Sequence, residues 1–228
     1  AAAGDPDLAL NTLMRVFDGA PEIGPALRED ETFRVRLIAL LGGSSAFGDH
    51  LAANPGTWQE LQRALPTPTE MLHTLLTTIG AEPATFAEQP DRPDTASEDL
   101  TTPGTYRAEA GEHKAQLKTV YRTLMMRIAA HDLAGTFHSR KGQSRPQPRV
   151  GFREVTRLTT ALADAALTAA LASAVRVVYG DDPLDAQLSV IAMGKCGAGE
   201  LNYISDVDVL FVGSEATPRV TRLASESV

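Results

Sequence analysis

Two aspartates near the end of the sequence are the residues whose type and spacing point most clearly to chemistry. Asp206 and Asp208 are separated by one residue and lead directly into the apolar run 209–212, which reads Val-Leu-Phe-Val. Side chains alternate between the two faces of a strand, so we expect both carboxylates to point the same way where a strand begins. Paired carboxylates repel each other unless a cation lies between them, and such oxygen ligands suit Mg²⁺, which in turn holds substrate phosphates. This spacing predicts a magnesium site for nucleotidyl transfer.

A turn containing glycine and lysine precedes the aspartates, with ten residues separating Lys195 from Asp206. Gly194 and Gly197 could be ordinary turn residues, or Gly194 could let the backbone approach a phosphate and present amide donors to it. The neighbouring aspartates favour phosphate binding. Lys195 is as compatible with a phosphate contact as with solvation. Ser205 could hydrogen-bond a phosphate or the backbone, and the sequence does not decide between them.

Other polar residues carry weaker signals. We expect Glu200 and Asn202 to cap a short helix, and Cys196 to be a small packing residue rather than a nucleophile. The five histidines show no metal-ligand spacing with the cysteine. The basic segment 139–150 is expected to be solvated, with contact to an acidic partner surface as the alternative.

Composition narrows the class of protein. The 228 residues include 21 lysines and arginines against 29 aspartates and glutamates, a net charge of −8, with few aromatic residues. Such an acidic chain is a poor candidate for nucleic-acid binding. A single cysteine excludes an internal disulfide and fits a reducing compartment, so we expect a cytoplasmic protein. We find no signal-peptide pattern and no apolar stretch of the roughly 18 residues that a membrane helix needs.

The patterning predicts an α+β protein, mostly helical before a partial nucleotidyltransferase-like α/β head. Apolar residues recur at helical spacing in the amino-terminal part, prolines and acids then interrupt the pattern, and period-2 alternation begins near Gln187. We expect long helices over 110–133 and 154–179, and neighbouring strands over 187–193 and 207–212. The expected organisation is a helical region at 1–80, a flexible linker or loop at 81–109, and the nucleotidyltransferase-like domain at 110–228, incomplete at its carboxyl end.

The motif resembles that of a known enzyme family. The segments Gly194-Lys195-Cys196-Gly197, Glu200-Leu201-Asn202 and Ser205-Asp206-Val207-Asp208 are similar to the signature of the bifunctional glutamine synthetase adenylyltransferase/adenylyl-removing family. Two other stretches, 40–58 and 127–135, resemble helical segments of the same family in the same order. The resemblance runs from about Asp5 to Val212, with Gly199 standing where the family often has a larger residue.

The resemblance implies a function and partners. The family has two nucleotidyltransferase domains, and this chain resembles the amino-terminal, adenylyl-removing one, which releases AMP from a tyrosine of glutamine synthetase by phosphorolysis to ADP. The whole family protein also adds AMP from ATP and responds to the PII signal protein. In the family a third carboxylate lies on a later strand, beyond Val228, so we expect this piece alone to be inactive. The alternatives are a non-catalytic fragment that binds glutamine synthetase, or a nucleotidyltransferase with another acceptor.

Overall fold

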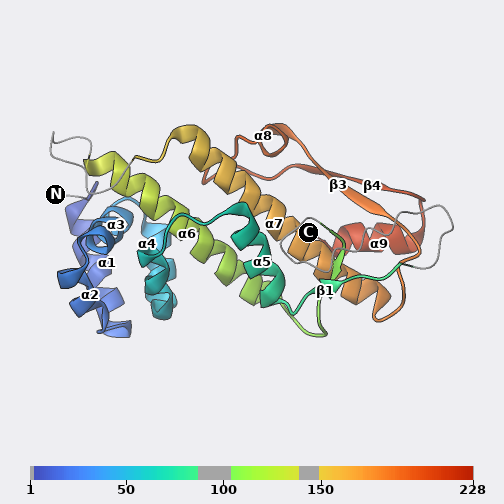
Figure 1. Ribbon diagram of the computed structural model, residues 1–228, viewed down its shortest axis with the longest axis horizontal. Coiled ribbons are helices and arrows are strands. Elements are labelled where there is room, and N and C mark those ends of the chain that lie inside the picture. The colour runs from blue at the N-terminus through green and yellow to red at the C-terminus, as the bar shows by residue number, and fades with distance from the viewer. Residues whose placement is uncertain (1–2, 87–103, 139–148, 228) are drawn as a thin grey trace. The chain divides into compact units, whose positions relative to one another are not determined.

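The structure is a computed structural model that describes residues 3–86, 104–138 and 149–227 (Figure 1). Its contacts group the chain into two compact units, each assembled from two separate segments. Unit 1 comprises Ala1–Pro66 and Arg122–Val155, and unit 2 comprises Thr67–Tyr121 and Thr156–Val228. The long helices α6 (Lys114–His138) and α7 (Phe152–Tyr179) therefore contribute to both units. Helices dominate and the strands are few, which confirms the α+β class; the domain boundaries expected above stay a prediction.

Unit 1 is a cluster of short helices packed around apolar side chains. Polar residues cap three of these helices, because the side chains of Asp5, Asp30 and Ser44 accept hydrogen bonds from amides in the first turn. Phe33 and Trp58 meet in the core with ring centroids 5.3 Å apart. The elements are α1 (Pro6–Gly19), α2 (Ile23–Glu29), α3 (Glu31–Leu41), α4 (Ser45–Ala53), the 3₁₀ helix η1 (Pro55–Gln62) and part of α6.

A buried polar network holds the end of η1 and the residues that follow it within unit 1. Arg36, Arg127 and His131 each lie within hydrogen-bond distance, 2.6 to 3.1 Å, of backbone carbonyls at 61–64. Arg127 also pairs with Glu60 at 3.1 Å. Burial and, to a lesser extent, the positive charges of Arg36 and Arg127 outweigh the hydrogen bond to the backbone, which raises the pKa, and together these effects lower the pKa of His131 to about 4. His131 is therefore a buried neutral residue of unit 1.

Unit 2 contains the strands and most of α7. Its apolar cluster joins Val175 and Tyr179 of α7 to Leu184 and to Leu223 of the last helix. The short β1 and β2 lie within the segment expected to be a linker, of which residues 87–103 are outside the described residues. The elements of this unit are α5 (Pro68–Thr78), β1 (Glu82–Pro83), β2 (Tyr106–Arg107), β3 (Leu188–Ala192), α8 (Gly194–Gly197), β4 (Val209–Gly213) and α9 (Pro218–Glu226).

The two predicted strands near the motif are neighbours, as expected. β3 and β4 pair antiparallel, with Leu188 opposite Gly213 and Ala192 opposite Val209. The second strand begins at Val209, two residues later than predicted, so Asp206 and Asp208 lie in the segment leading into it. The helix after β3 is α8, a single turn at one end of the hairpin (Figure 1).

Helix α7 corrects one expectation from the sequence. Among the described residues it is long and apolar enough, by length and composition, to cross a membrane, so the statement that no stretch reaches that length was wrong. Alanines and valines supply the apolar character, and several of them, such as Ala172 and Val175, are buried in the core of unit 2. Because the core helix of a soluble protein passes the same test, this property by itself is weak evidence for a membrane span.

Candidate metal and phosphate site

The end of the β3–β4 hairpin brings one predicted carboxylate to the glycine turn. The amide of Met193 donates to the carbonyl of Asp208 at 2.8 Å, which extends the strand pairing by one residue beyond Ala192 and Val209. Gly194 follows directly with φ +53°, a conformation that favours glycine. A Cβ added to Gly194 would lie 3.4 Å from Oδ2 of Asp208. Gly194 and Asp208 therefore lie next to each other, and their joint role in one phosphate and metal site stays a prediction.

Helix α8 is a tight turn that depends on its second glycine. The amide of Gly197 donates to the carbonyl of Met193 at 3.0 Å, and the amide of Glu200 donates to the carbonyl of Lys195 at 2.8 Å. A Cβ on Gly197 would collide with the carbonyl oxygen of Ala192. The backbone conformation of the turn thus explains by itself why both positions are glycine. Contact of these glycines with phosphate stays a prediction.

Ser205 belongs to a turn organised by Asn202. The Ser205 hydroxyl donates to Oδ1 of Asn202 at 2.9 Å, and the same oxygen accepts from the amide of Ile204 at 3.1 Å. The amide of Asn202 in turn donates to Oγ of Ser205 at 3.4 Å. The Asn202 side chain therefore stabilises the turn before the aspartates. Because α8 already ends at Gly197, the expectation that Asn202 caps a helix was wrong.

The charged residues of the motif are open to solvent. Asp206, Asp208 and Lys195 are all exposed, so water, ions and phosphates can reach them. Within the described ranges, no group of three or more His, Cys, Asp and Glu side chains converges on a metal position, so the candidate ligands are the two aspartates alone. This donor set fits Mg²⁺, which keeps several waters and binds through one or two carboxylates plus substrate phosphates.

Two buried threonines of α7, which the sequence analysis missed, hydrogen-bond to the segment between the glycine turn and the aspartates. The Thr159 hydroxyl donates to the carbonyl of Leu201 at 2.6 Å, and Oγ1 of Thr160 accepts from the amide of the same residue at 3.2 Å. Leu201 thus has both backbone groups bound to one helix. Adjacent threonines in an alanine-rich helix were the available signal, because hydroxyls inside an otherwise apolar helix need hydrogen-bond partners.

Cys196 packs under the same turn, as the sequence predicted. It is buried against Ala163 of α7 and Leu201. Burial raises the pKa of the Cys196 thiol, and the negative charges of Asp164 and Asp208 raise it further. A thiol with a raised pKa is a poor nucleophile at neutral pH, which supports a packing role.

Asp164 was also missed by the sequence analysis. It lies one helical turn beyond Thr160 on α7, and partial loss of hydration raises the pKa of its carboxyl group. Its charge acts on Cys196 together with that of Asp208, so α7 contributes a further carboxylate to the electrostatics around the turn.

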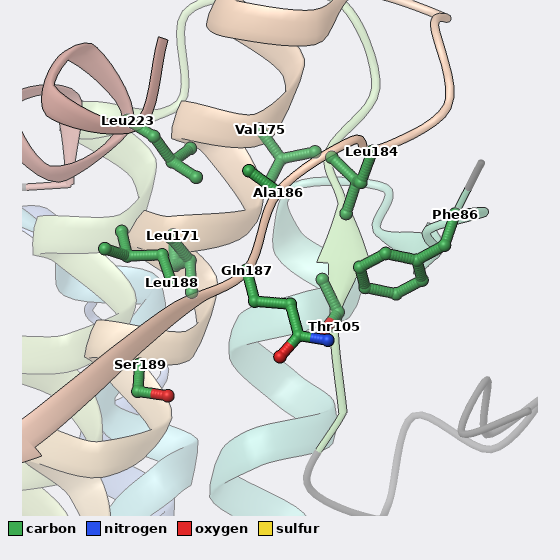
Figure 2. Close-up of a pocket in the computed structure, with 10 residues that line it drawn as sticks. All are labelled: Phe86, Thr105, Leu171, Val175, Leu184, Ala186, Gln187, Leu188, Ser189 and Leu223. Atoms are coloured by element: carbon green, nitrogen blue, oxygen red, sulfur yellow. The ribbon is translucent and has the colours of Figure 1, made fainter. Parts of the chain in front are cut away.

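A separate cavity of about 180 Å³ lies in unit 2 (Figure 2). Its walls include Phe86, Leu184, Leu223 and, directly before β3, Gln187. None of its lining residues belongs to the segment 194–208, so this hollow and the candidate site are different places on unit 2.

Comparison with known proteins identifies the family. The family model described as glutamate-ammonia ligase adenylyltransferase matches residues 35–227. The chain belongs to this family, which confirms the resemblance found in the motif. No solved structure gave a significant match.

Several curated relatives are similar over essentially the whole chain. A bifunctional glutamine synthetase adenylyltransferase/adenylyl-removing enzyme of Corynebacterium efficiens is 54% identical over 100% of this chain and 23% of its own length. Enzymes of the same description from Corynebacterium diphtheriae and Nocardia farcinica are 48% and 45% identical, over 100% and 98% of this chain. The chain spans less than a quarter of the length of these relatives.

Proposed function

We propose that this chain carries a nucleotidyltransferase site that removes AMP from a tyrosine of glutamine synthetase by phosphorolysis. The observation that carries the proposal is the approach of the Asp208 carboxylate to the Gly194 turn, with Asp206 two residues away, in a chain of the adenylyltransferase family. The relatives are described as acting on glutamine synthetase in both directions. The match falls in the amino-terminal part of these relatives, which favours the adenylyl-removing domain.

In the proposed reaction, the aspartates bind the metal ion and the glycine turn with Lys195 positions the phosphates. Asp206 and Asp208 would hold Mg²⁺, which when bound supplies positive charge to the transferred phosphoryl group. Lys195 and the glycine turn would contact the attacking phosphate or the AMP phosphate. An oxygen of phosphate bonds to the AMP phosphorus while the bond from phosphorus to the tyrosine oxygen breaks. The tyrosine oxygen takes the proton given up by the phosphate, and ADP leaves. Such a transfer depends mainly on orientation and electrostatic stabilisation.

The opposite direction is the second candidate. The matching family model is described by adenylyl transfer, and addition of AMP from ATP passes through the same phosphorus chemistry. In either direction we place the protein in the cytoplasm, with ATP or ADP and phosphate as small-molecule partners and PII signal protein as the regulator. We expect this segment alone to turn over below detection, because two carboxylates give Mg²⁺ few protein ligands.

The test uses the longest natural protein that contains this sequence. It is incubated with Mg²⁺, inorganic phosphate and glutamine synthetase carrying AMP on tyrosine, and ADP formation is followed; a parallel reaction contains ATP and unmodified glutamine synthetase. We expect phosphate-dependent ADP formation that Asp206→Asn and Asp208→Asn each abolish. The matched control Asp18→Asn changes an exposed aspartate of unit 1 and should leave the rate unchanged.

The outcomes separate the candidates. ADP formation that survives both substitutions would contradict the proposed role of the aspartates. Loss of AMP addition, with removal intact, would assign this site to the adenylylating direction. Binding of glutamine synthetase with neither reaction affected would favour a non-catalytic role for this part of the chain.

A further inference from the structure

Leu201 lies in the middle of the segment that joins the two halves of the candidate site. The glycine turn with Lys195 precedes it, and the two aspartates follow it. Leu201 is 3% exposed and belongs to a small apolar cluster with Ala163 of α7, Ala192 of β3 and Cys196 of α8. This cluster therefore joins α7, β3 and α8 beside the glycine turn.

Both backbone groups of Leu201 are bound to α7. The Thr159 hydroxyl donates to the Leu201 carbonyl at 2.6 Å, and the Thr160 hydroxyl accepts from the Leu201 amide at 3.2 Å. The Thr160 hydroxyl gives its own proton to the carbonyl of Thr156 at 2.8 Å, which leaves a lone pair to accept from that amide. All three threonines are buried, so the bonds form where a hydrogen bond is stronger than in water.

A second set of hydrogen bonds continues from Leu201 toward the first aspartate. The next residue is Asn202, whose amide donates to Oγ of Ser205 at 3.4 Å and whose Oδ1 accepts from the Ser205 hydroxyl at 2.9 Å. The Ser205 amide also donates to the Asn202 carbonyl at 3.3 Å. Because Asp206 follows Ser205 directly, hydrogen bonds and peptide bonds form an unbroken series from a buried helix to a candidate metal ligand.

We propose that Thr159 and Thr160 are positioning residues for the metal and phosphate site. By holding Leu201, they set where Asp206 lies relative to the glycine turn. Asp208 is fixed separately, because its carbonyl accepts from the amide directly after β3 at 2.8 Å. A metal ion shared by two carboxylates requires both to be held in place, and groups that orient metal ligands typically change affinity by about 10- to 100-fold.

The inference rests on the proposed function, and the experiment measures metal binding and turnover separately. It uses the longest natural protein that contains this sequence, with Mn²⁺ as the probe for the Mg²⁺ site. The dissociation constant of Mn²⁺ is measured by electron paramagnetic resonance, and the relevant ion is the one whose binding is lost in both Asp206→Asn and Asp208→Asn. Phosphate-dependent ADP formation is then followed while Mg²⁺ and adenylylated glutamine synthetase are each varied.

Four variants test the path from the helix to the aspartate. Thr160→Val removes the oxygen that accepts from the Leu201 amide, and Thr160→Ser keeps it. Asn202→Ala interrupts the path at a half-buried side chain, so it also tests the proposal if Thr160→Val does not fold. The matched control Thr168→Val loses the same kind of bond within α7, to the carbonyl four residues earlier at 2.9 Å.

The positioning role predicts a selective loss of metal affinity. In Thr160→Val the dissociation constant of Mn²⁺ and the Mg²⁺ concentration for half-maximal rate should both rise roughly tenfold or more, with KM for glutamine synthetase unchanged. Thr160→Ser should restore both values, and Thr168→Val should match the wild type. Combining Thr160→Val with Asn202→Ala should weaken Mn²⁺ binding no further than the worse single change, because residues on one path are not additive.

Other results would overturn the inference. Wild-type Mn²⁺ affinity in Thr160→Val and Asn202→Ala would do so, even if the melting temperature fell, because the threonines would then have a purely structural role. Additive losses in the double variant would contradict the path through Asn202. Weaker Mn²⁺ binding in variants of a protein that forms no ADP would support the positioning role and contradict the proposed function. If no bound Mn²⁺ depends on the aspartates, both are wrong.

Discussion

The hydrogen bonds between α7 and Leu201 lead to a quantitative prediction for Thr160→Val. Valine keeps the shape of threonine but removes the oxygen that accepts from the Leu201 amide at 3.2 Å. Leu201 is 3% exposed, so water cannot readily replace the lost partner. An unpaired buried amide costs about 1–3 kcal/mol, which corresponds to roughly a 5- to 150-fold increase in local opening.

Amide hydrogen exchange of Leu201 measures that opening directly. We expect its protection to fall by this factor in Thr160→Val, and to recover in Thr160→Ser, which restores the hydroxyl. The matched control is Thr168→Val on the same helix: the hydroxyl of Thr168 is exposed and donates to the carbonyl of Asp164, four residues earlier. The control removes this within-helix bond and leaves the Leu201 amide bonded.

Two outcomes of the exchange measurement would contradict this prediction. Wild-type protection of Leu201 in Thr160→Val would mean that the bond contributes nothing to holding the turn on α7. Equal losses in Thr160→Val and Thr168→Val would mean that the effect comes from α7 as a helix and not from its contact with Leu201.

Two further predictions concern the core of unit 1 and the glycine turn. His131 has a folded pKa of about 4 against an unfolded value of about 6.5, so its neutral form contributes roughly 3 kcal/mol to the free energy of unfolding. This contribution is fully present above pH 6.5 and is lost as the pH falls toward 4. Unfolding followed by Trp58 fluorescence should show this loss of stability in acid, and His131→Gln should reduce it. Gly197→Ala should abolish exchange protection across α8, because its Cβ would collide with Ala192, whereas Gly199→Ala, at φ +71° in open space, should cost only about 1–2 kcal/mol. Equal stability at pH 7 and pH 4.5, or equal effects of the two alanines, would contradict these arguments.

The local secondary structure around the motif was the part most readily predicted from the sequence. The alternating pattern before the glycine turn and the apolar run after Asp208 predicted a strand on each side, and the paired strands β3 and β4 follow that pattern. The start of β4 was placed too early, because Val207 has strand propensity but lies before the pairing begins at Val209. Strand boundaries depend on the partner strand, which a single sequence does not reveal.

Contacts between distant segments were beyond the sequence. Nothing local indicates that Thr159 and Thr160 bind Leu201, some forty residues away. Likewise Arg36 and His131, far apart in the chain, bind carbonyls of the same segment at 61–64. Such pairings are set by how helices pack, and a buried polar residue shows only that it needs a partner, not which one.

The central claim is that Asp206 and Asp208 form one metal site at the glycine turn. Titration of the chain with Mn²⁺, as a paramagnetic substitute for Mg²⁺, while amide signals are followed by NMR, tests it most directly. The account predicts that broadening begins at Gly194, Lys195 and the segment 205–208, that excess Mg²⁺ reverses it, and that Asp206→Asn or Asp208→Asn each removes it. Broadening centred on another acidic region, or unchanged by either substitution, would contradict the claim.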